Sequence, residues 1–428
     1  MYSEGYMLWR CKMSNIHING GRRLSGSTSV HGAKNSVLPI LAAAVLSEGT
    51  SIIKGCPSLS DVDCSLSILR FLGCKTKREG DTVVVDASTL SKSTIPETLM
   101  HKMRSSITFL GALTAKCGEA KMCFPGGCEL GPRPIDLHIK ALREIGIRVK
   151  EKGGTICARL GDFKGGRVHL DFPSVGATEN VMMAAALAKG ETILTNAAKE
   201  PEILDLQNFL NKMGAKISGA GTDEIRIMGV PRLSGATHKV IPDRIVAATY
   251  LCAGAITGGD ILLREAEPSH IEAVLSALRD LGATVFVKDN MVRLSAPSRP
   301  KALNLLRTMP YPGFPTDAQA LMTALLSVAE GTSVIEETIF ENRFKHCSAL
   351  CRMGADITTR GSLAIIRGVP ALSGARVEAC ELRGGAALVL AGLRAEGETI
   401  VSGTKYIDRG YDTFVEDMCA LGADIRRK

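Results

Sequence analysis

Residues 124–138 read Phe-Pro-Gly-Gly-Cys-Glu-Leu-Gly-Pro-Arg-Pro-Ile-Asp-Leu-His and place a thiol beside several polar groups. Two adjacent glycines and three prolines exclude a regular helix or strand from this stretch. The glycine pair allows the backbone to hinge, while the prolines limit its path. The pattern predicts that Cys128 is a reactive group on a lid-like loop, with Arg133 five residues further on. A structural cysteine in a Gly-Gly turn is the alternative interpretation.

Other polar residues stand directly before apolar stretches that predict buried helices. Lys34 and Asn35 precede the apolar stretch 37–46. A lysine at a helix start opposes the helix dipole, so either it is solvated or a bound anion offsets the penalty. Asp317 precedes the stretch 320–328, where it is either functional or a helix-start carboxylate. Residues 174–180 stand in the same way before the stretch 181–188.

Arginines in loops add to this set, at Arg104, Arg133, Arg343, Arg383 and Arg409. Forked guanidinium groups suit carboxylate and phosphate oxygens. Taken singly, each arginine is better explained as part of a surface ion pair, but together they predict a cleft for several negative charges. The net charge of +8 also favours anionic partners. Aromatic residues make up only 4% of the chain and the basic residues form no long run, so we expect a small polyanionic substrate and no nucleic acid.

Composition also limits the location and the cofactors. The longest apolar stretch, 37–46, is far below the roughly 18 residues that cross a bilayer. Residues 1–14 lack the features of a signal peptide, so we expect a cytoplasmic protein without membrane partners. The 13 cysteines include no Cys-x-x-Cys pair and no zinc-ligand spacing. We therefore expect reduced thiols, no structural metal and no cofactor.

A sixfold repeat predicts the elements that position these residues. An apolar residue followed by glycine recurs about every 70 residues. The six glycines of this marker are Gly73, Gly146, Gly214, Gly282, Gly354 and Gly422. One unit predicts a buried helix over 245–256, a strand over 260–263, an amphipathic helix over 270–281, a hairpin of 284–287 with 291–294, and a strand over 302–306. The unit is thus β-α-β-α-β-β, with one buried and one surface helix.

The two ends of the chain predict how the units are divided between domains. The sixth unit stops at Lys428, before its return strand, and the segment 20–26 matches segments that follow return strands elsewhere. Residues 16–30 are therefore expected to complete the sixth unit. This predicts a discontinuous domain of residues 1–33 and 242–428, and an inserted domain of residues 34–241 that carries the Cys128 loop. Residues 1 to about 15 are expected to form a loose extension.

At this point the motifs resemble those of the UDP-N-acetylglucosamine enolpyruvyl transferase family. The resemblance runs in order from about Ile16 to the C-terminus, and its motifs lie at 34–35, 125–138, 174–180, 314–319, 337–344 and 407–411. It implies an α/β fold of two domains, each an inside-out α/β barrel of three units. It also implies transfer of the enolpyruvyl group of phosphoenolpyruvate to the 3-hydroxyl of UDP-N-acetylglucosamine, with release of phosphate, as the first committed step of peptidoglycan synthesis.

The resemblance assigns roles to individual residues. Cys128 is similar to the family's general acid, which protonates the alkene and forms a covalent adduct with phosphoenolpyruvate; Lys34 and Arg133 are expected to lower the pKa of this thiol. Asp317 matches the carboxylate at the sugar hydroxyl, and Lys34 and Arg409 complete the catalytic set. The implied phosphoenolpyruvate contacts are Lys34, Asn35, Arg133, Arg383 and Arg409. The implied nucleotide-sugar contacts are Arg104, Arg133, Pro134, Ile135, Asp136, Leu137, Ser174, Val175, Gly176, Asp317, Ile339, Phe340 and Arg343.

The sequence departs from the family pattern near the predicted cleft. Thr108 stands where a bulky tryptophan is common, and Glu381 stands where aspartate is usual. Gly384 and Gly385 replace larger residues. We expect these changes to loosen the packing.

Three other functions are compatible with parts of the pattern. A sister enzyme that acts on shikimate 3-phosphate shares the repeat but lacks the Pro-Gly-Gly-Cys loop. A catalytically weak paralogue with a binding or regulatory role is compatible with the departures. A basic nucleic-acid-binding module is compatible with the charge alone.

Overall fold

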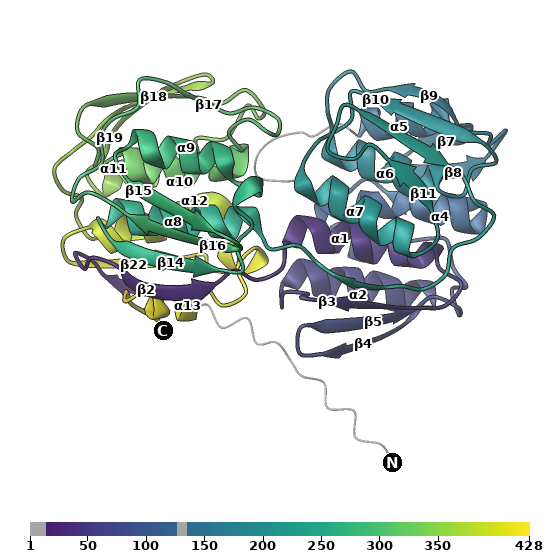
Figure 1. The fold of residues 1–428 in the computed structure, drawn as a ribbon, viewed down its shortest axis with the longest axis horizontal. Helices are drawn as coiled ribbons and strands as arrows, with labels where there is room; N and C mark the ends of the chain where they lie inside the picture. Colours follow the sequence, from purple (N-terminus) through teal and green to yellow (C-terminus); the bar gives the residue numbers. More distant parts are fainter. Residues whose placement is uncertain (1–13, 126–134) are drawn as a thin grey trace, which may run out of the picture.

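The computed structural model describes residues 14–125 and 135–428, which form two lobes side by side (Figure 1). Each lobe has its own hydrophobic core. We call them the α1 lobe, with core residues from Ala33 to Val240, and the α8 lobe, with core residues from Ile16 to Val30 and from Val246 to Ile425. Residues 1–13 of the predicted extension and the loop residues Cys128, Arg133 and Pro134 lie outside the described residues. Asn15, at the end of that extension, is bonded through its backbone to Lys428.

Within the described residues, six small sheets correspond to the six predicted repeats. In the α1 lobe, the strands of the first sheet lie in the order β13 (Thr237–Lys239), β3 (Thr50–Lys54), β5 (Thr82–Asp86), β4 (Lys75–Glu79). Those of the second sheet lie in the order β6 (Glu119–Cys123), β8 (Thr155–Leu160), β7 (Ile147–Lys152). Those of the third lie in the order β9 (Gly166–His169), β10 (Glu191–Thr195), β12 (Glu224–Met228), β11 (Lys216–Ser218). In the α8 lobe, the strands of the first sheet lie in the order β2 (Ser25–Ser29), β14 (Asp260–Arg264), β16 (Met291–Ser295), β15 (Thr284–Lys288). Those of the second sheet lie in the order β17 (Leu306–Arg307), β18 (Thr332–Glu336), β20 (Leu363–Arg367), β19 (Asp356–Arg360). Those of the third lie in the order β21 (Arg376–Glu378), β22 (Glu398–Ser402), β1 (Ile16–Asn19), β23 (Asp424–Arg427).

Each unit contributes one helix to the interior of its lobe. The buried helices are α1 (Lys34–Ala43), α4 (Phe109–Cys117), α6 (Val175–Ala185), α8 (Arg244–Ile256), α10 (Thr316–Leu326) and α12 (Leu382–Arg394). They are apolar or small on nearly every side, as a helix surrounded by protein requires. The helices that keep a solvated face are α2 (Ser60–Leu72), α5 (Asp136–Glu144), α7 (Pro201–Lys212), α9 (Glu272–Asp280), α11 (Cys347–Arg352) and α13 (Phe414–Ala420), beside the short α3 (Glu97–Met100).

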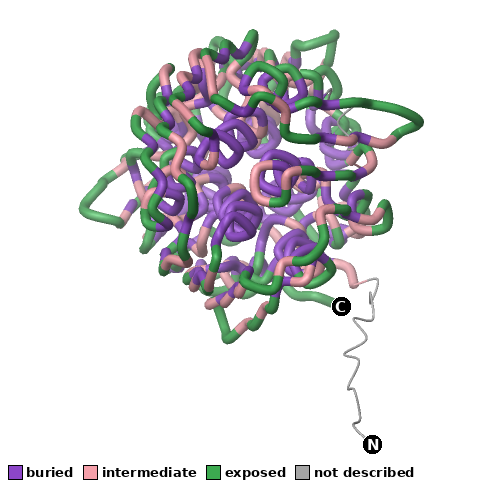
Figure 2. The backbone as a smooth tube through the Cα atoms, turned by 90° about the vertical axis from the view of Figure 1, so that its right-hand side faces the viewer, coloured by how far each residue is buried: buried purple, intermediate pink, exposed green. Residues whose placement is uncertain are grey.

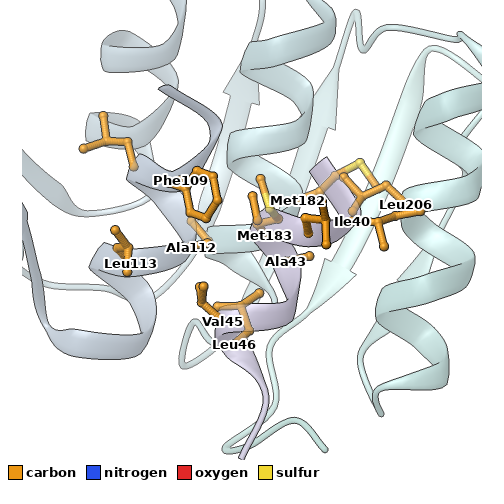
Figure 3. Close-up of a cluster of buried hydrophobic side chains, with 14 of the residues drawn as sticks. Ile40, Ala43, Val45, Leu46, Phe109, Ala112, Leu113, Met182, Met183 and Leu206 are labelled. Carbon is orange, nitrogen blue, oxygen red and sulfur yellow. The ribbon is translucent and has the colours of Figure 1, made fainter. Parts of the chain in front are cut away.

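The view along one lobe shows buried helices in the centre and exposed segments at the periphery (Figure 2). This is the inside-out arrangement that the repeat and the resemblance predicted. Figure 3 shows part of the interior of the α1 lobe, where Ile40 and Leu46 lie with Phe109, Met183 and Leu206. These side chains come from distant parts of the sequence, so the core holds the units together.

The marker glycines of the repeat have a common backbone role. All six lie close after a solvated helix and have φ angles between 90° and 104°. Residues with a side chain rarely adopt this left-handed conformation, whereas glycine adopts it without steric cost. The periodic glycine thus marks the end of the second helix of each unit.

The N-terminal segment completes the sixth unit, as predicted. β1 lies between β22 and β23, with Ile16 opposite both Val401 and Arg427. In the other units of this lobe, the corresponding place belongs to the return strands β16 and β20. The chain then passes between the lobes twice, and the two crossings pair with one another: Ala33 N–H donates to Ile241 O at 2.7 Å, and Asp243 N–H donates to His31 O at 2.8 Å.

The unit predicted in detail is confirmed except for one strand. The buried helix, the amphipathic helix and the hairpin appear as α8, α9 and β15–β16. The strand predicted over 302–306 is wrong in extent, because regular pairing covers only β17, Leu306–Arg307. Leu303 N–H donates to the Ser333 hydroxyl at 2.9 Å, so a side chain interrupts the main-chain ladder there.

Candidate active site

The polar residues that the sequence places in loops before buried helices lie within the first turns of these helices. α1 begins at Lys34, α10 begins at Thr316, and Ser174 caps α6 by accepting a hydrogen bond from Ala177 N–H. The predicted loops are therefore shorter than expected. The helices start earlier because polar residues near an N-terminus are compatible with the unpaired N–H groups there.

Lys34 is buried and paired with a carboxylate. Its side chain lies 2.6 Å from Asp61 of α2, and its exposed fraction is 9%. Asp61 also accepts from Arg409 of the α8 lobe, at 3.2 Å from Nε. One carboxylate of the α1 lobe thus holds a lysine of its own lobe and an arginine of the other. The solvated-lysine interpretation is wrong, and two of the predicted catalytic residues lie together.

The charges around Lys34 alter its protonation. Burial lowers the pKa of the Lys34 ammonium below its usual value of 10.5, and the charges of Arg409 and Arg383 add to this effect. Asp61 opposes the lowering without overcoming it. For Asp61, burial raises the pKa, but Lys34 and Arg409 outweigh burial and the net pKa is lowered. Lys34 and Arg409 therefore share one ionised carboxylate, and Arg383 adds a third positive charge that acts on Lys34.

Asp317 lies between two arginines. Arg343 Nη2 donates to Asp317 Oδ1 at 2.7 Å, and Arg383 Nη2 lies 3.5 Å from Asp317 Oδ2. Both guanidinium groups are buried, with exposed fractions of 3% and 2%. Both arginines belong to other segments of the α8 lobe, so Asp317 lies where three segments of this lobe meet.

A second carboxylate orders the segment after β18. Glu337 Oε1 accepts from Ile339 N–H at 2.8 Å, from Phe340 N–H at 3.2 Å and from the Thr308 hydroxyl at 2.9 Å. Its other oxygen accepts from the Thr316 hydroxyl at 2.9 Å. Glu337 thereby fixes the predicted nucleotide-sugar contacts next to the first turn of α10.

The described nucleotide-sugar candidates of the α1 lobe lie at helix starts near His138. Asn180 Oδ1 accepts from Gly111 N–H at 2.7 Å, so its amide nitrogen faces His138 Nδ1 at 2.8 Å as the donor. A Cβ on Gly176 would lie 2.8 Å from His138 Cε1, so glycine is required there. Burial, followed by the charge of Arg104, lowers the pKa of His138 to about 4, so the imidazole is neutral.

These contacts bring together the starts of three helical segments. Ile135, Asp136 and Leu137 open α5, Ser174, Val175 and Gly176 open α6, and Arg104 opens the 3₁₀ helix Arg104–Thr108. Ile339 and Phe340 come from the other lobe. Asn35, half-buried, follows Lys34 in α1. Cys128, Arg133 and Pro134 lie outside the part of the chain that the structure describes.

The predicted loosening at Gly384 and Gly385 is wrong. A Cβ on Gly385 would lie 2.8 Å from Ile407 Cγ1 and 2.9 Å from Ala379 Cβ. A Cβ on Gly384 would lie 2.5 Å from Glu381 Oε1. Glu381 caps α12 by accepting from the backbone N–H groups of Arg383 and Gly384. The glycines therefore fit a closely packed helix start, which positions Arg383. Thr108 is also buried, and its hydroxyl donates to Ser105 O at 2.7 Å.

Gly385→Ala is expected to lower the free energy of unfolding by about 1–3 kcal/mol, because the added methyl group overpacks the site. It is also expected to lower activity, since Ile407 begins the turn that ends in Arg409. Gly49→Ala is the control, because its Cβ would have no neighbour closer than 3.9 Å. Denaturant midpoints measure both effects on stability. Equal midpoints for the two variants would contradict the close packing.

Sequence reasoning missed Asp61, Asp243 and Glu337. Asp243 accepts from Lys34 N–H at 3.0 Å through Oδ2 and caps α8 through Oδ1, at 2.9 Å from Ile245 N. An aspartate directly before a buried helix is a recognisable capping signal, so Asp243 was detectable. Asp61 is paired with side chains distant in sequence, for which no local pattern exists. Glu337 accepts from the nearby N–H groups of Ile339 and Phe340, and its link to the remote hydroxyls of Thr308 and Thr316 has no local pattern either.

Two further features of the described residues bear on the assignment. No helix among them is long and apolar enough to cross a membrane. A hollow of about 410 Å³ among Lys216, Arg226 and Met228 contains none of the predicted site residues. We place the site where Lys34, Asp317 and the arginines lie, because the hollow includes none of these residues.

The chain is similar to several known proteins in sequence and in structure. Residues 18–418 match the family model described as EPSP synthase (3-phosphoshikimate 1-carboxyvinyltransferase). UDP-N-acetylglucosamine 1-carboxyvinyltransferase 2 of Caldanaerobacter subterraneus subsp. tengcongensis is 52% identical over 97% of this chain and 100% of its own length. UDP-N-acetylglucosamine 1-carboxyvinyltransferase 1 of Carboxydothermus hydrogenoformans is 50% identical over 97% and 98%. The crystal structure of the enolpyruvyl transferase NikO from Streptomyces tendae superimposes with a TM-score of 0.85 at 25% identity, over 97% of this chain and 99% of that one.

Proposed function

The chain belongs to the EPSP synthase family, and we propose that it transfers the enolpyruvyl group of phosphoenolpyruvate to the 3-hydroxyl of UDP-N-acetylglucosamine, releasing phosphate. This is the first committed step of peptidoglycan synthesis. The nearly full-length relatives at 50–52% identity support this acceptor over shikimate 3-phosphate. The observation that carries the proposal is the Lys34–Asp61–Arg409 group, which unites cations of both lobes at one point.

Phosphoenolpyruvate carries a phosphate and a carboxylate, so its site requires several cations. We assign Lys34 and Arg409 to these anionic groups, together with Asn35, Arg133 and Arg383. Lys34 and Arg383 are buried, and charges in such surroundings act more strongly than in water. Asp61 keeps Lys34 and Arg409 close together before substrate arrives, because their mutual repulsion would otherwise separate them.

The reaction requires two proton transfers. The 3-hydroxyl oxygen bonds to C2 of phosphoenolpyruvate while its proton leaves, and C3 gains a proton to become a methyl group. We assign the C3 proton to the Cys128 thiol and the hydroxyl to Asp317. Loss of a proton from C3 and of phosphate from C2 of the resulting ketal then restores the alkene. Arg343 and Arg383 hold the two oxygens of Asp317, which orients the carboxylate toward the hydroxyl in this proposal.

The nucleotide-sugar binds, in this proposal, along Arg104, the 133–137 segment and Ser174–Gly176 in one lobe, and along Asp317, Ile339, Phe340 and Arg343 in the other. We propose domain boundaries at 33/34 and 241/242, where the paired crossings lie. Closure of the two domains around the substrates would exclude water from the site. We further propose a cytoplasmic location, where both substrates are available, with no membrane or nucleic-acid partner.

Phosphate release from phosphoenolpyruvate tests the proposed function. The protein is incubated with phosphoenolpyruvate and either UDP-N-acetylglucosamine or shikimate 3-phosphate, and phosphate is measured over time. Release only with UDP-N-acetylglucosamine is expected. Release only with shikimate 3-phosphate would assign the sister reaction, and no release with either would favour a binding or regulatory paralogue.

The lowered pKa of Lys34 predicts a pH dependence of phosphoenolpyruvate binding. The lysine loses its proton below the usual value of 10.5, so binding of the anion is expected to weaken as the pH rises through this lowered pKa. Arginine stays protonated to higher pH, so Lys34→Arg should move the alkaline loss upward. Calorimetric binding in a Cys128→Ser background measures this without titrating that thiol. Identical alkaline limbs with and without the Lys34→Arg substitution would contradict the assignment.

A further inference from the structure

Ser36, in the first turn of α1, is bonded to a carboxylate that the proposed reaction does not use. Its hydroxyl donates to Asp205 Oδ2 of α7. The Ser36 side chain has no exposed surface, and Asp205 is 3% exposed. A buried, ionisable carboxylate is costly unless several donors compensate it, so its partners indicate what it is for.

The other partners of Asp205 come from β13 and from the second crossing between the lobes, which follows it. Ile241 N–H donates to Asp205 Oδ2 at 3.3 Å, and His238 Nε2 lies 2.8 Å from Asp205 Oδ1. Lys212 Nζ lies 3.2 Å from His238 Nδ1. An ammonium group only donates, so Nδ1 is the acceptor and Nε2 carries the hydrogen that faces Asp205. Ser36, Ile241 and His238 therefore all donate to this one carboxylate.

The first turn of α1 is consequently held at two points. Asp243, at the end of the crossing, accepts from Lys34 N–H at 3.0 Å, and Asp205 accepts from the Ser36 hydroxyl. Both carboxylates also contact the crossing itself or the helix that follows it. The Lys34 side chain leaves the helix between these two fixed points, so its direction toward Asp61 depends on both of them.

We propose that Asp205 is a positioning residue for Lys34, acting through Ser36, and that it couples the first turn of α1 to the crossing between the lobes. The inference rests on the proposed function, in which Lys34 binds phosphoenolpyruvate. If the network served stability alone, its loss would lower the melting temperature and change the KM values for both substrates to the same extent. A positioning role instead affects phosphoenolpyruvate selectively, because Ser36 lies two residues from Lys34.

Ser36→Ala tests the coupling with the loss of one hydroxyl. We expect the KM for phosphoenolpyruvate to rise about tenfold, since small misplacements of binding groups have large effects, while the KM for UDP-N-acetylglucosamine changes less than about twofold. Ser327→Ala is the matched control. Ser327 is equally buried, and its hydroxyl donates at 2.8 Å to Thr323 O within the same helix. The control is expected to leave both KM values unchanged.

Hydrogen exchange tests the coupling between α1 and the crossing without an activity assay. In Asp205→Asn, hydrogen exchange is expected to accelerate both at the start of α1 and in residues 239–243, but not in α10. Acceleration in only one of the two segments, or equal KM values in Ser36→Ala and Ser327→Ala, would overturn the inference. If the wild-type protein released no phosphate with UDP-N-acetylglucosamine, the proposed function and the assigned role toward phosphoenolpyruvate would both fail, whatever the exchange rates.

Discussion

Asp317→Ala is expected to lower kcat by about two to four orders of magnitude, the range typical of a lost acid–base group. The carboxylate is proposed to receive the proton of the attacking hydroxyl, and no other described carboxylate is bonded to both Arg343 and Arg383. Its removal also leaves these two buried guanidinium groups without their shared anion. Breaking a buried ion pair costs about 3–5 kcal/mol, so stability has to be measured beside turnover.

Asp317→Asn separates the two effects. The amide keeps the volume and still accepts from Arg343, but it cannot take a proton at neutral pH. Its kcat is expected to fall nearly as far as that of the alanine variant, with a smaller loss of stability. Asp260→Asn is the control, because Asp260 forms an exposed pair with Arg293 at 2.9 Å in the same lobe. Near wild-type turnover in a folded Asp317→Asn protein would leave the helix-start interpretation as the better one.

Cys128→Ser is expected to abolish covalent modification by fosfomycin, a phosphonate epoxide that resembles phosphoenolpyruvate. The thiolate sulfur opens the epoxide by attack at carbon, and a serine hydroxyl is far less nucleophilic near neutral pH. Intact-mass spectra after incubation with fosfomycin and UDP-N-acetylglucosamine measure the adduct. The wild-type protein should gain the mass of one fosfomycin and the variant should gain none.

The other cysteines make this experiment specific. The buried thiols Cys56, Cys252 and Cys347 have pKa values raised to about 12, chiefly by burial, so they are poor nucleophiles at neutral pH. Cys117→Ser, at an exposed thiol of the α1 lobe, is a suitable control and should keep the adduct. An adduct of the same mass on Cys128→Ser would refute the assignment of Cys128.

Much of the architecture was predictable from the sequence, because each repeat needs the same residue types at the same turns and in the same helices. A helix end that needs a left-handed residue selects glycine, so Gly73, Gly282 and Gly422 report the same turn in three units. A helix such as α8, which is apolar on every side, is recognisable from its sequence as an interior helix. The strand over 302–306 was misjudged because its pairing depends on the Ser333 hydroxyl of another segment, which no local pattern contains.

The predicted site was less complete than the predicted fold. Lys34, Asp317 and the arginines carry conspicuous charge at helix starts and in loops, and the resemblance assigned them roles. Asp61 and Glu337 escaped notice because an acidic residue near a helix or after a strand is common. What distinguishes them is their bonds to remote segments, from Asp61 to Arg409 and from Glu337 to Thr308 and Thr316. Gly384 and Gly385 were misread, since replacement of large residues by glycine was taken for loss of packing. Around them, neighbouring atoms occupy the freed space.

The position of β1 between β22 and β23 has a consequence for biosynthesis. A ribosome makes β1 before every other described strand and β23 after all of them, so β1 waits for both of its neighbours until the strands of the α1 lobe have been made. Meanwhile all strands of the α1 lobe have already appeared, and this lobe has every partner it needs to fold during translation. A nascent chain stalled shortly before Asp424 would hold one finished lobe and one whose sheet is still open along an unpaired edge.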